Sequence, residues 1–90
     1  MQRQSLVEVR VLYFAKSRDL AGTAEEIIKV PDRVTSQLLL EIITDRHIEL
    51  KTIQQNLILA VNQDYISEES GEIQLSTGDE IAVIPPLSGG

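Results

Sequence analysis

The sequence contains no cysteine and no tryptophan, and only Tyr13, Phe14 and Tyr65 are aromatic. Without cysteine there is no disulfide, no thiolate metal site, no cysteine nucleophile and no persulfide that would carry sulfur. Apolar residues still make up 42% of the 90 residues. The core is therefore expected to be aliphatic, built from Ile, Leu, Val and Ala.

Long apolar runs and positive charge are also scarce. No run reaches the length of a membrane span, and the N-terminal segment lacks the apolar stretch of a signal peptide, so we expect a cytosolic protein. Eight Lys and Arg face fourteen Asp and Glu, which gives a net charge of −6 at pH 7. Such a surface repels nucleic acid and anionic lipid, and we expect neither as a partner.

Metal-binding and catalytic side chains are few. The single histidine, His47, has no evident acid or nucleophile beside it, and we interpret it as a surface residue at a helix end. Asp79 and Glu80 stand beside Gly78, which is more typical of a turn than of a cation site. We therefore expect no metal site.

Alternating apolar residues predict the first strand, from residue 6 to residue 15. One face of this strand is apolar throughout. The other begins with the charged Glu8 and Arg10 and then turns apolar at Leu12 and Phe14. Either a second layer of the protein or a partner is expected to cover that end of the strand. The apolar face consists of Val7, Val9, Val11 and Tyr13.

The remaining pattern predicts four more strand-like runs and one clear helix. The helix begins near Asp32 or Thr35, ends near Arg46 and presents Leu38, Leu39, Ile42 and Ile43 to a sheet, with Leu40 off that stripe. The strands cover 25–30, 57–62, a fourth in short pieces at 65–66 and 73–75, and 80–84, while 16–22 forms a loop or short helical turn. This β-β-α-β-β order predicts one α+β domain over 1–90, a ubiquitin-like β-grasp with one helix on a mixed sheet and a tail from about residue 85.

The last strand leads into two prolines, Leu87, Ser88, Gly89 and Gly90. Proline stops a strand, and glycine has no Cβ, so the walls of an enzyme can close around this backbone. The pattern predicts a carrier that works through the carboxylate of Gly90, with Ser88 and Gly89 passing through a narrow channel. The dipeptide alone leaves open an ordinary frayed terminus.

Three segments resemble the small, sulfur-carrying subunits of molybdopterin synthase. They are VLYFA at 11–15 with RDLAG at 18–22, AVNQ at 60–63, and GDEIA at 78–82 leading to PPLSGG at 85–90. The resemblance implies a β-grasp carrier whose Gly90 carboxylate is adenylated by an enzyme related to those that activate ubiquitin. That enzyme uses ATP, and the carrier itself holds no tightly bound cofactor.

The resemblance also implies the steps after activation. Sulfur replaces AMP to give a thiocarboxylate at Gly90, and the carrier docks on a large catalytic subunit in a heterotetramer. There it donates sulfur to cyclic pyranopterin monophosphate, and two transfers complete the dithiolene of molybdopterin. This chain is expected to supply no catalytic side chain.

Docking on the large subunit is predicted for the outer faces of the first and last strands, at Leu12, Phe14 and Ile84, extended by Leu87 and Tyr65. A small second core under a loop is the alternative for these residues. Three other functions stay open: a β-grasp sulfur carrier for thiamine synthesis or tRNA thiolation, a protein modifier that forms isopeptide bonds, and a plain interaction module. The PPLS segment before Gly-Gly favours the molybdopterin synthase subunit over the other sulfur carriers.

Overall fold

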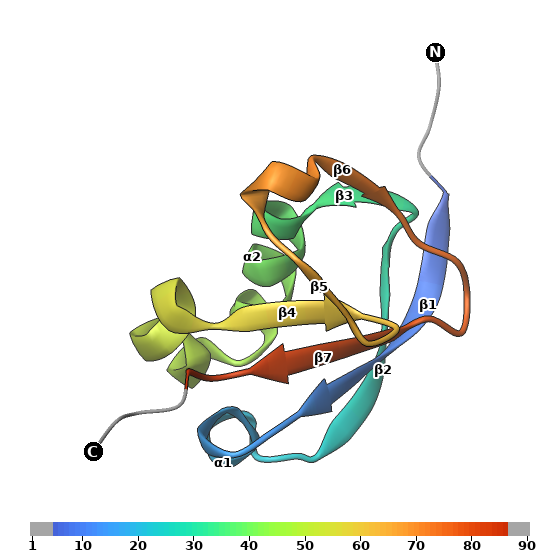
Figure 1. Cartoon of the computed structure of the whole chain (residues 1–90). Helices are drawn as coiled ribbons and strands as arrows, with labels where there is room; N and C mark the ends of the chain where they lie inside the picture. The colour runs from blue at the N-terminus through green and yellow to red at the C-terminus, as the bar shows by residue number, and fades with distance from the viewer. Residues whose placement is uncertain (1–4, 87–90) are drawn as a thin grey trace.

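The computed structural model describes residues 5–86, which form a five-stranded sheet, a main helix and a small second sheet (Figure 1). The same residues also form a further short helix, α1, and two 3-10 segments, η1 and η2. In order, the elements are β1 (Leu6–Tyr13), α1 (Lys16–Ala21), β2 (Glu25–Pro31), β3 (Arg33–Thr35), α2 (Ser36–Arg46), η1 (Ile48–Asn56), β4 (Ile58–Val61), β5 (Asp64–Ile66), η2 (Glu68–Ser70), β6 (Glu72–Gln74) and β7 (Glu80–Ile84).

The large sheet has the strand order β2-β1-β7-β4-β5. The central strand, β7, runs parallel to its neighbour β1 although the two lie at opposite ends of the sequence, and the other neighbours are antiparallel (Figure 1). One main helix, α2, packs against one face of this mixed sheet. The predicted α+β, ubiquitin-like β-grasp is confirmed.

The predicted fourth strand was wrong, because its two pieces belong to different sheets. β5 pairs with β4 at the edge of the large sheet, whereas β6 pairs with β3 in a separate two-stranded sheet. Between them the chain turns through η2, where Ser67 and Ser70 form a reciprocal capping box. The sequence pattern also missed β3, because a three-residue strand is too short to show a period.

The helix α2 begins where the Thr35 hydroxyl accepts a hydrogen bond from the Leu38 N–H at 3.1 Å. The predicted apolar stripe was partly wrong: Leu38 is 42% exposed, whereas Leu40 packs against the core. From Ser36, residues three and four apart meet the sheet, so the buried face contains small polar side chains that an apolar pattern does not reveal. Its buried residues are Ser36, Leu39, Ile43 and Thr44.

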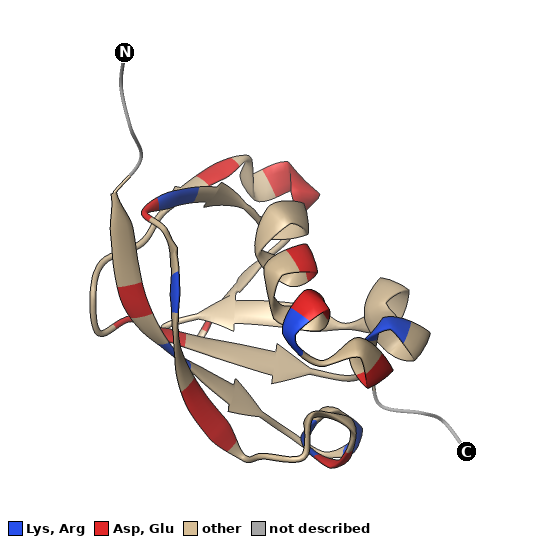
Figure 2. Ribbon diagram, turned by 180° about the vertical axis from the view of Figure 1, so that it is seen from behind, with Lys and Arg blue, Asp and Glu red and all other residues tan. Residues whose placement is uncertain are grey.

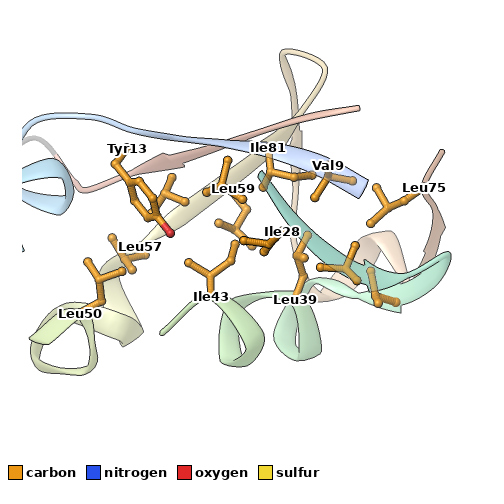
Figure 3. Close-up of a cluster of buried hydrophobic side chains, with 14 residues drawn as sticks. Val9, Tyr13, Ile28, Leu39, Ile43, Leu50, Leu57, Leu59, Leu75 and Ile81 are labelled. Carbon is orange, nitrogen blue, oxygen red and sulfur yellow. The ribbon is translucent and has the colours of Figure 1, made fainter. Parts of the chain in front are cut away.

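The core lies between α2 and the inner face of the sheet (Figure 3). As predicted, it is aliphatic, and its one aromatic member is Tyr13. β7 shows the alternation most clearly, because Ile81 and Val83 are fully buried while Ala82 and Ile84 on the other face are half-exposed. This buried layer holds the strands in a fixed register, and the register then determines what appears on the outer face.

Candidate functional site

The outer face of the sheet, opposite α2, carries a row of apolar side chains across four strands. Leu12 of β1 lies opposite Ala82 of β7, Ala82 opposite Ala60 of β4, and Ala60 opposite Tyr65 of β5. Residues paired in this way share one face of a sheet. In a second row, Ile84 lies opposite Ile58. We call these residues together with Phe14 the outer patch: Leu12, Phe14, Ile58, Ala60, Tyr65, Ala82 and Ile84.

Apart from Ala60, which is only 4% exposed, the outer patch is more exposed than a core would be. Tyr65 is 73% exposed, Phe14 46% and Ile58 43%, while Leu12 and Ile84 are half-buried. A contiguous exposed apolar surface of this kind marks an interaction site. Leu12, Ile84 and Tyr65 thus share one face of the sheet, as predicted. The exposure of Tyr65, Phe14 and Ile58 does not fit the alternative of a small second core. The docking role itself stays a prediction.

Two members of the outer patch, Ile58 and Ala60, were missed in the sequence. Their alternation with Leu59 and Val61 was visible, but only the pairing of β4 with β7 brings them beside Ile84 and Ala82.

The buried Ser17 fixes the end of β1 against β7, next to the outer patch. Its hydroxyl oxygen lies 2.6 Å from the carbonyl oxygen of Phe14 and 3.0 Å from that of Val83, and it accepts the Phe14 N–H at 3.0 Å. Between these residues, Ala15 adopts φ of 53°, which is unfavourable for a residue with a side chain. Because of this turn β1 ends at Tyr13 rather than at residue 15, and Phe14 projects into solvent beside β7.

A two-residue hairpin holds β4 and β5 in register with β7. Asn62 and Gln63 both have positive φ, 50° and 74°, as this tight turn requires. The Asn62 side chain donates to Asp79 Oδ1 at 3.1 Å and accepts the Glu80 N–H at 3.0 Å. Asp79 also accepts the Ser76 N–H at 2.8 Å. Asp79 is thus part of a turn, and the AVNQ and GDE segments join to align the strands that carry the outer patch.

A polar cluster joins β1, β2 and the end of α2. Glu26 Oε2 accepts the Tyr13 hydroxyl at 2.6 Å and lies 2.6 Å from His47 Nε2, while its Oε1 lies 3.5 Å from Arg46. The rings of Tyr13 and His47 meet edge to face at 5.4 Å. The interpretation of His47 as an unpartnered surface residue was therefore wrong, because its acid comes from a strand far away in the sequence.

The cluster shifts the pKa values of Tyr13 and Glu26 in opposite directions. Burial raises the pKa of Tyr13, and its hydrogen bond to the Glu26 carboxylate raises it further. Burial alone would raise the pKa of Glu26, but hydrogen bonds from Tyr13 and His47 and the nearby positive charge outweigh it and lower that pKa. The tyrosine is thus a fixed hydrogen-bond donor and the glutamate a fixed anion, which suits a structural link between elements.

The rest of the described surface offers little for chemistry. An open groove of about 1000 Å³ lies between α2, η1 and the β4–β5 hairpin, lined mainly by Gln, Asn, Ser and aliphatic side chains. Within residues 5–86, no group of three or more His, Asp or Glu side chains is placed to hold a metal ion. Over the same residues, no helix is long and apolar enough to cross a bilayer.

The route to the predicted reactive end starts at β7. Pro85 and Pro86 follow this strand at the end of the sheet where α1 and η1 lie (Figure 1). Leu87, Ser88, Gly89 and Gly90 lie outside the described residues, so the predictions made for them stand as predictions.

Comparison with known proteins shows to which family this chain belongs. Residues 11–90 match the ThiS family. The chain belongs to the ThiS family. Curated relatives include the molybdopterin synthase sulfur carrier subunits of Drosophila erecta, 47% identical, and Homo sapiens, 44% identical, in alignments that cover 94% of this chain and 93% and 97% of theirs.

Solved structures similar to this ThiS-family chain share its fold. A putative molybdopterin converting factor subunit 1 from Pyrococcus furiosus is 35% identical with a TM-score of 0.73, covering 90% of this chain and 99% of its own. Small archaeal modifier protein 1 from Methanosarcina acetivorans is 31% identical with a TM-score of 0.73, covering 96% and 99%. A complex of subunits 1 and 2 of the molybdopterin-converting factor from Helicobacter pylori contains a chain 25% identical with a TM-score of 0.66, covering 93% and 100%.

Proposed function

We propose that this ThiS-family chain is the sulfur carrier subunit of a molybdopterin synthase. The observation that carries the proposal is the outer patch on β7, the strand that leads directly toward Gly89 and Gly90. A partner that covers the outer patch would hold the domain while the following residues reach into a site that a folded domain cannot enter. The identity of 44–47% to sulfur carrier subunits over nearly the whole chain supports the same conclusion.

The proposed chemistry takes place at Gly90. A terminal carboxylate has an unperturbed pKa of about 3.3–3.7, so it is ionised at neutral pH and is a poor electrophile. An activating enzyme therefore uses ATP to form the acyl adenylate with release of pyrophosphate. A sulfur nucleophile then displaces AMP and leaves a thiocarboxylate. This sulfur is donated to cyclic pyranopterin monophosphate, and water cleaves the bond between the Gly90 carbonyl and the transferred sulfur, which returns the carboxylate. Two such donations form the dithiolene of molybdopterin.

The partners follow from this scheme. The large subunit of the synthase docks on the outer patch in a heterotetramer. The solved complex of subunits 1 and 2 of the Helicobacter pylori converting factor supports a large subunit as the partner. A ubiquitin-activating-like enzyme loads the terminus. The carrier holds no tightly bound cofactor, contributes no catalytic side chain and works in the cytosol.

The test is a reconstituted synthase with three forms of the carrier. Chemically prepared thiocarboxylate at Gly90 should support molybdopterin formation, whereas removal of Gly90 or an uncleaved C-terminal tag should abolish it. All three forms should keep the same melting temperature and large-subunit affinity. Full activity from a blocked terminus would rule out the carrier proposal.

A second candidate is a protein modifier, which the 31% identity to small archaeal modifier protein 1 favours. Both candidates use an activated C-terminus but differ in the acceptor. Intact-mass measurement after expression with the activating enzyme separates them. One oxygen-to-sulfur exchange on the chain supports the sulfur carrier, and larger adducts linked to lysine of other proteins support the modifier.

A further inference from the structure

Strand β2 is the other edge of the sheet, and within residues 5–86 no strand pairs with the side of β2 that faces away from β1. Tyr13 N donates to Ala24 O at 2.8 Å and Asp32 N donates to Ser5 O at 2.9 Å, one at each end of the β1–β2 pair. Because bonding alternates along an antiparallel pair, the even-numbered residues of β2 face β1. The backbone groups of Glu25, Ile27 and Lys29 therefore face away from the sheet.

This open edge is short and has defined ends. Pro31 lacks an N–H, which ends pairing on one side. On the other side the Thr23 hydroxyl donates to the Glu25 carbonyl at 2.9 Å, which leaves that carbonyl one further lone pair. Ile27 at the centre is 66% exposed. An exposed apolar residue at the middle of an unpaired strand is the kind of edge that takes up another strand.

We propose that β2 is a self-association edge, at which a second copy of this chain adds its own β2 in antiparallel orientation. The two-fold axis passes through Ile27, so that Ile27 faces Ile27 of the second copy and Glu25 faces Lys29 twice. These three residues are also the ones whose N–H and C=O groups face outward, so the ladder and the side-chain pairing agree in this register.

The charged side chains of β1, next to β2, also favour this register. Within one copy, Glu8 lies opposite Lys29 and Leu12 opposite Glu25. In the joined sheet, each Lys29 would sit between Glu8 of its own chain and Glu25 of the second copy. Along β2 the acidic and basic positions are visible in Figure 2. Opposite charges directly across a strand pair stabilise it, and like charges destabilise it.

Neighbouring registers would pair like charges, or a charged side chain with an apolar one, and are therefore less favourable. A two-fold axis at Glu25 would place two glutamates together, and one at Lys29 would place two lysines together. An axis at Glu26 or Ile28 would set a charged side chain against Ile27. Only the axis at Ile27 pairs opposite charges and puts the apolar residue against itself.

The helix side of the sheet offers further apolar surface at this edge. Arg46, at the end of α2, reaches Glu26 of β2, so this flank of α2 faces the β2 edge. One and two turns earlier on the same flank lie the half-buried Ile42 and Leu38, which is 42% exposed. In a two-fold pair the matching flank of the second α2 would come to the same side. The outer patch, centred on β7, β4 and β5, would remain free for a partner.

The test is the association state of the full chain by analytical ultracentrifugation at about 0.15 M salt, where charge repulsion is screened beyond about 8 Å. The mass should rise with concentration from the 10.0 kDa monomer toward twice that value. Amide exchange at Ile27 and Lys29 should slow in parallel. A monomer at every attainable concentration would overturn the proposal.

Variants test the edge and its register. Ile27→Lys should lower the association constant at least about tenfold, whereas the control Ile48→Lys, at an equally exposed residue in η1, should not change it. Glu25→Lys and Lys29→Glu should each weaken association. The double variant should restore part of it, because Lys29→Glu also places a carboxylate opposite Glu8 of the same chain. Association that survives Ile27→Lys, that is lost with Ile58→Lys in the outer patch instead, or that the double variant fails to restore even in part would each contradict the proposal. Melting temperature verifies that each variant is folded.

Discussion

The two faces of the five-stranded sheet are built from the same strands but are covered differently. The inner face meets α2, and most of its side chains on β1, β7 and β4 are almost fully buried. The outer face has no helix over it within residues 5–86, yet much of it is also apolar. Since a strand alternates between faces, adjacent residues serve different purposes: one stabilises the domain and the next is available to a partner.

The largest effect on stability should come from the inner face of β7. Ile81→Ala removes a fully buried side chain and should lower the free energy of unfolding by about 2–5 kcal/mol. Ile84→Ala, three residues away on the outer face, should lower it by about 1 kcal/mol or less. Urea denaturation of both variants measures the difference. Equal losses would mean that the outer face is a second core.

The polar cluster at the rim of the inner face should show in the pH dependence of stability. Glu26→Gln should lower the free energy of unfolding at neutral pH by about 1.5–3 kcal/mol, the usual contribution of hydrogen bonds to a charged group. Because folding lowers the pKa of Glu26, its stabilisation is complete above its ordinary pKa of 4.5 and is lost as pH falls through the lower folded value.

Denaturation curves from neutral to acidic pH check this prediction. Stability of the wild type should fall in acid, and that of Glu26→Gln should fall less. The matched control is Glu41→Gln on the exposed side of α2, which should follow the wild type. Parallel acid limbs for the wild type and Glu26→Gln would show that the carboxylate does not stabilise the fold in this way.

The outer face should matter for binding more than for folding. Phe14→Ala or Ile84→Asp should weaken the complex with the large subunit by about 2 kcal/mol or more, as expected for an interface anchor. Calorimetric titration measures the affinity, and thermal melting of the isolated variant measures its stability. Variants that unfold alone but bind normally when folded would assign these residues to the core.

The smallest effect on stability is expected at Gly89. Gly89→Val should leave the melting temperature and large-subunit affinity nearly unchanged, because a chain end contributes little to a core. It should strongly reduce loading, transfer or both, since a stiff β-branched side chain would have to pass both active sites. Loading by the activating enzyme and transfer from prepared thiocarboxylate are measured separately. Wild-type rates in both assays would contradict the passage role.

Local patterns in the sequence predicted much of the fold. Residues 80–84 form the last strand as predicted, with the predicted faces, because its alternation is complete and turn residues and prolines bound it. The helix α2, Ser36–Arg46, is also close to the prediction, because Thr35 is a good N-cap directly before it. Its buried face was less visible, since Ser36 and Thr44 are buried polar residues that an apolar count leaves out.

The candidate site was predicted in part. Leu12, Ile84 and Tyr65 were placed on one face from alternation together with the expected β-grasp topology. Ile58 was missed because only the pairing of β4 with β7 places it beside Ile84. His47 was misread for the same reason, since its partner Glu26 lies on a strand 21 residues away.

Composition and periodicity were enough to predict the aliphatic core, the order of the main strands and the main helix, and the absence of cysteine chemistry, because they are properties of the chain alone. The tertiary structure decided the pairing of β1 with β7 and of β4 with β7, the split of β5 and β6 into two sheets, and the joining of Tyr13, Glu26 and His47. These contacts unite segments far apart in sequence. Their choice depends on the simultaneous burial of all the inner side chains, which no local pattern contains.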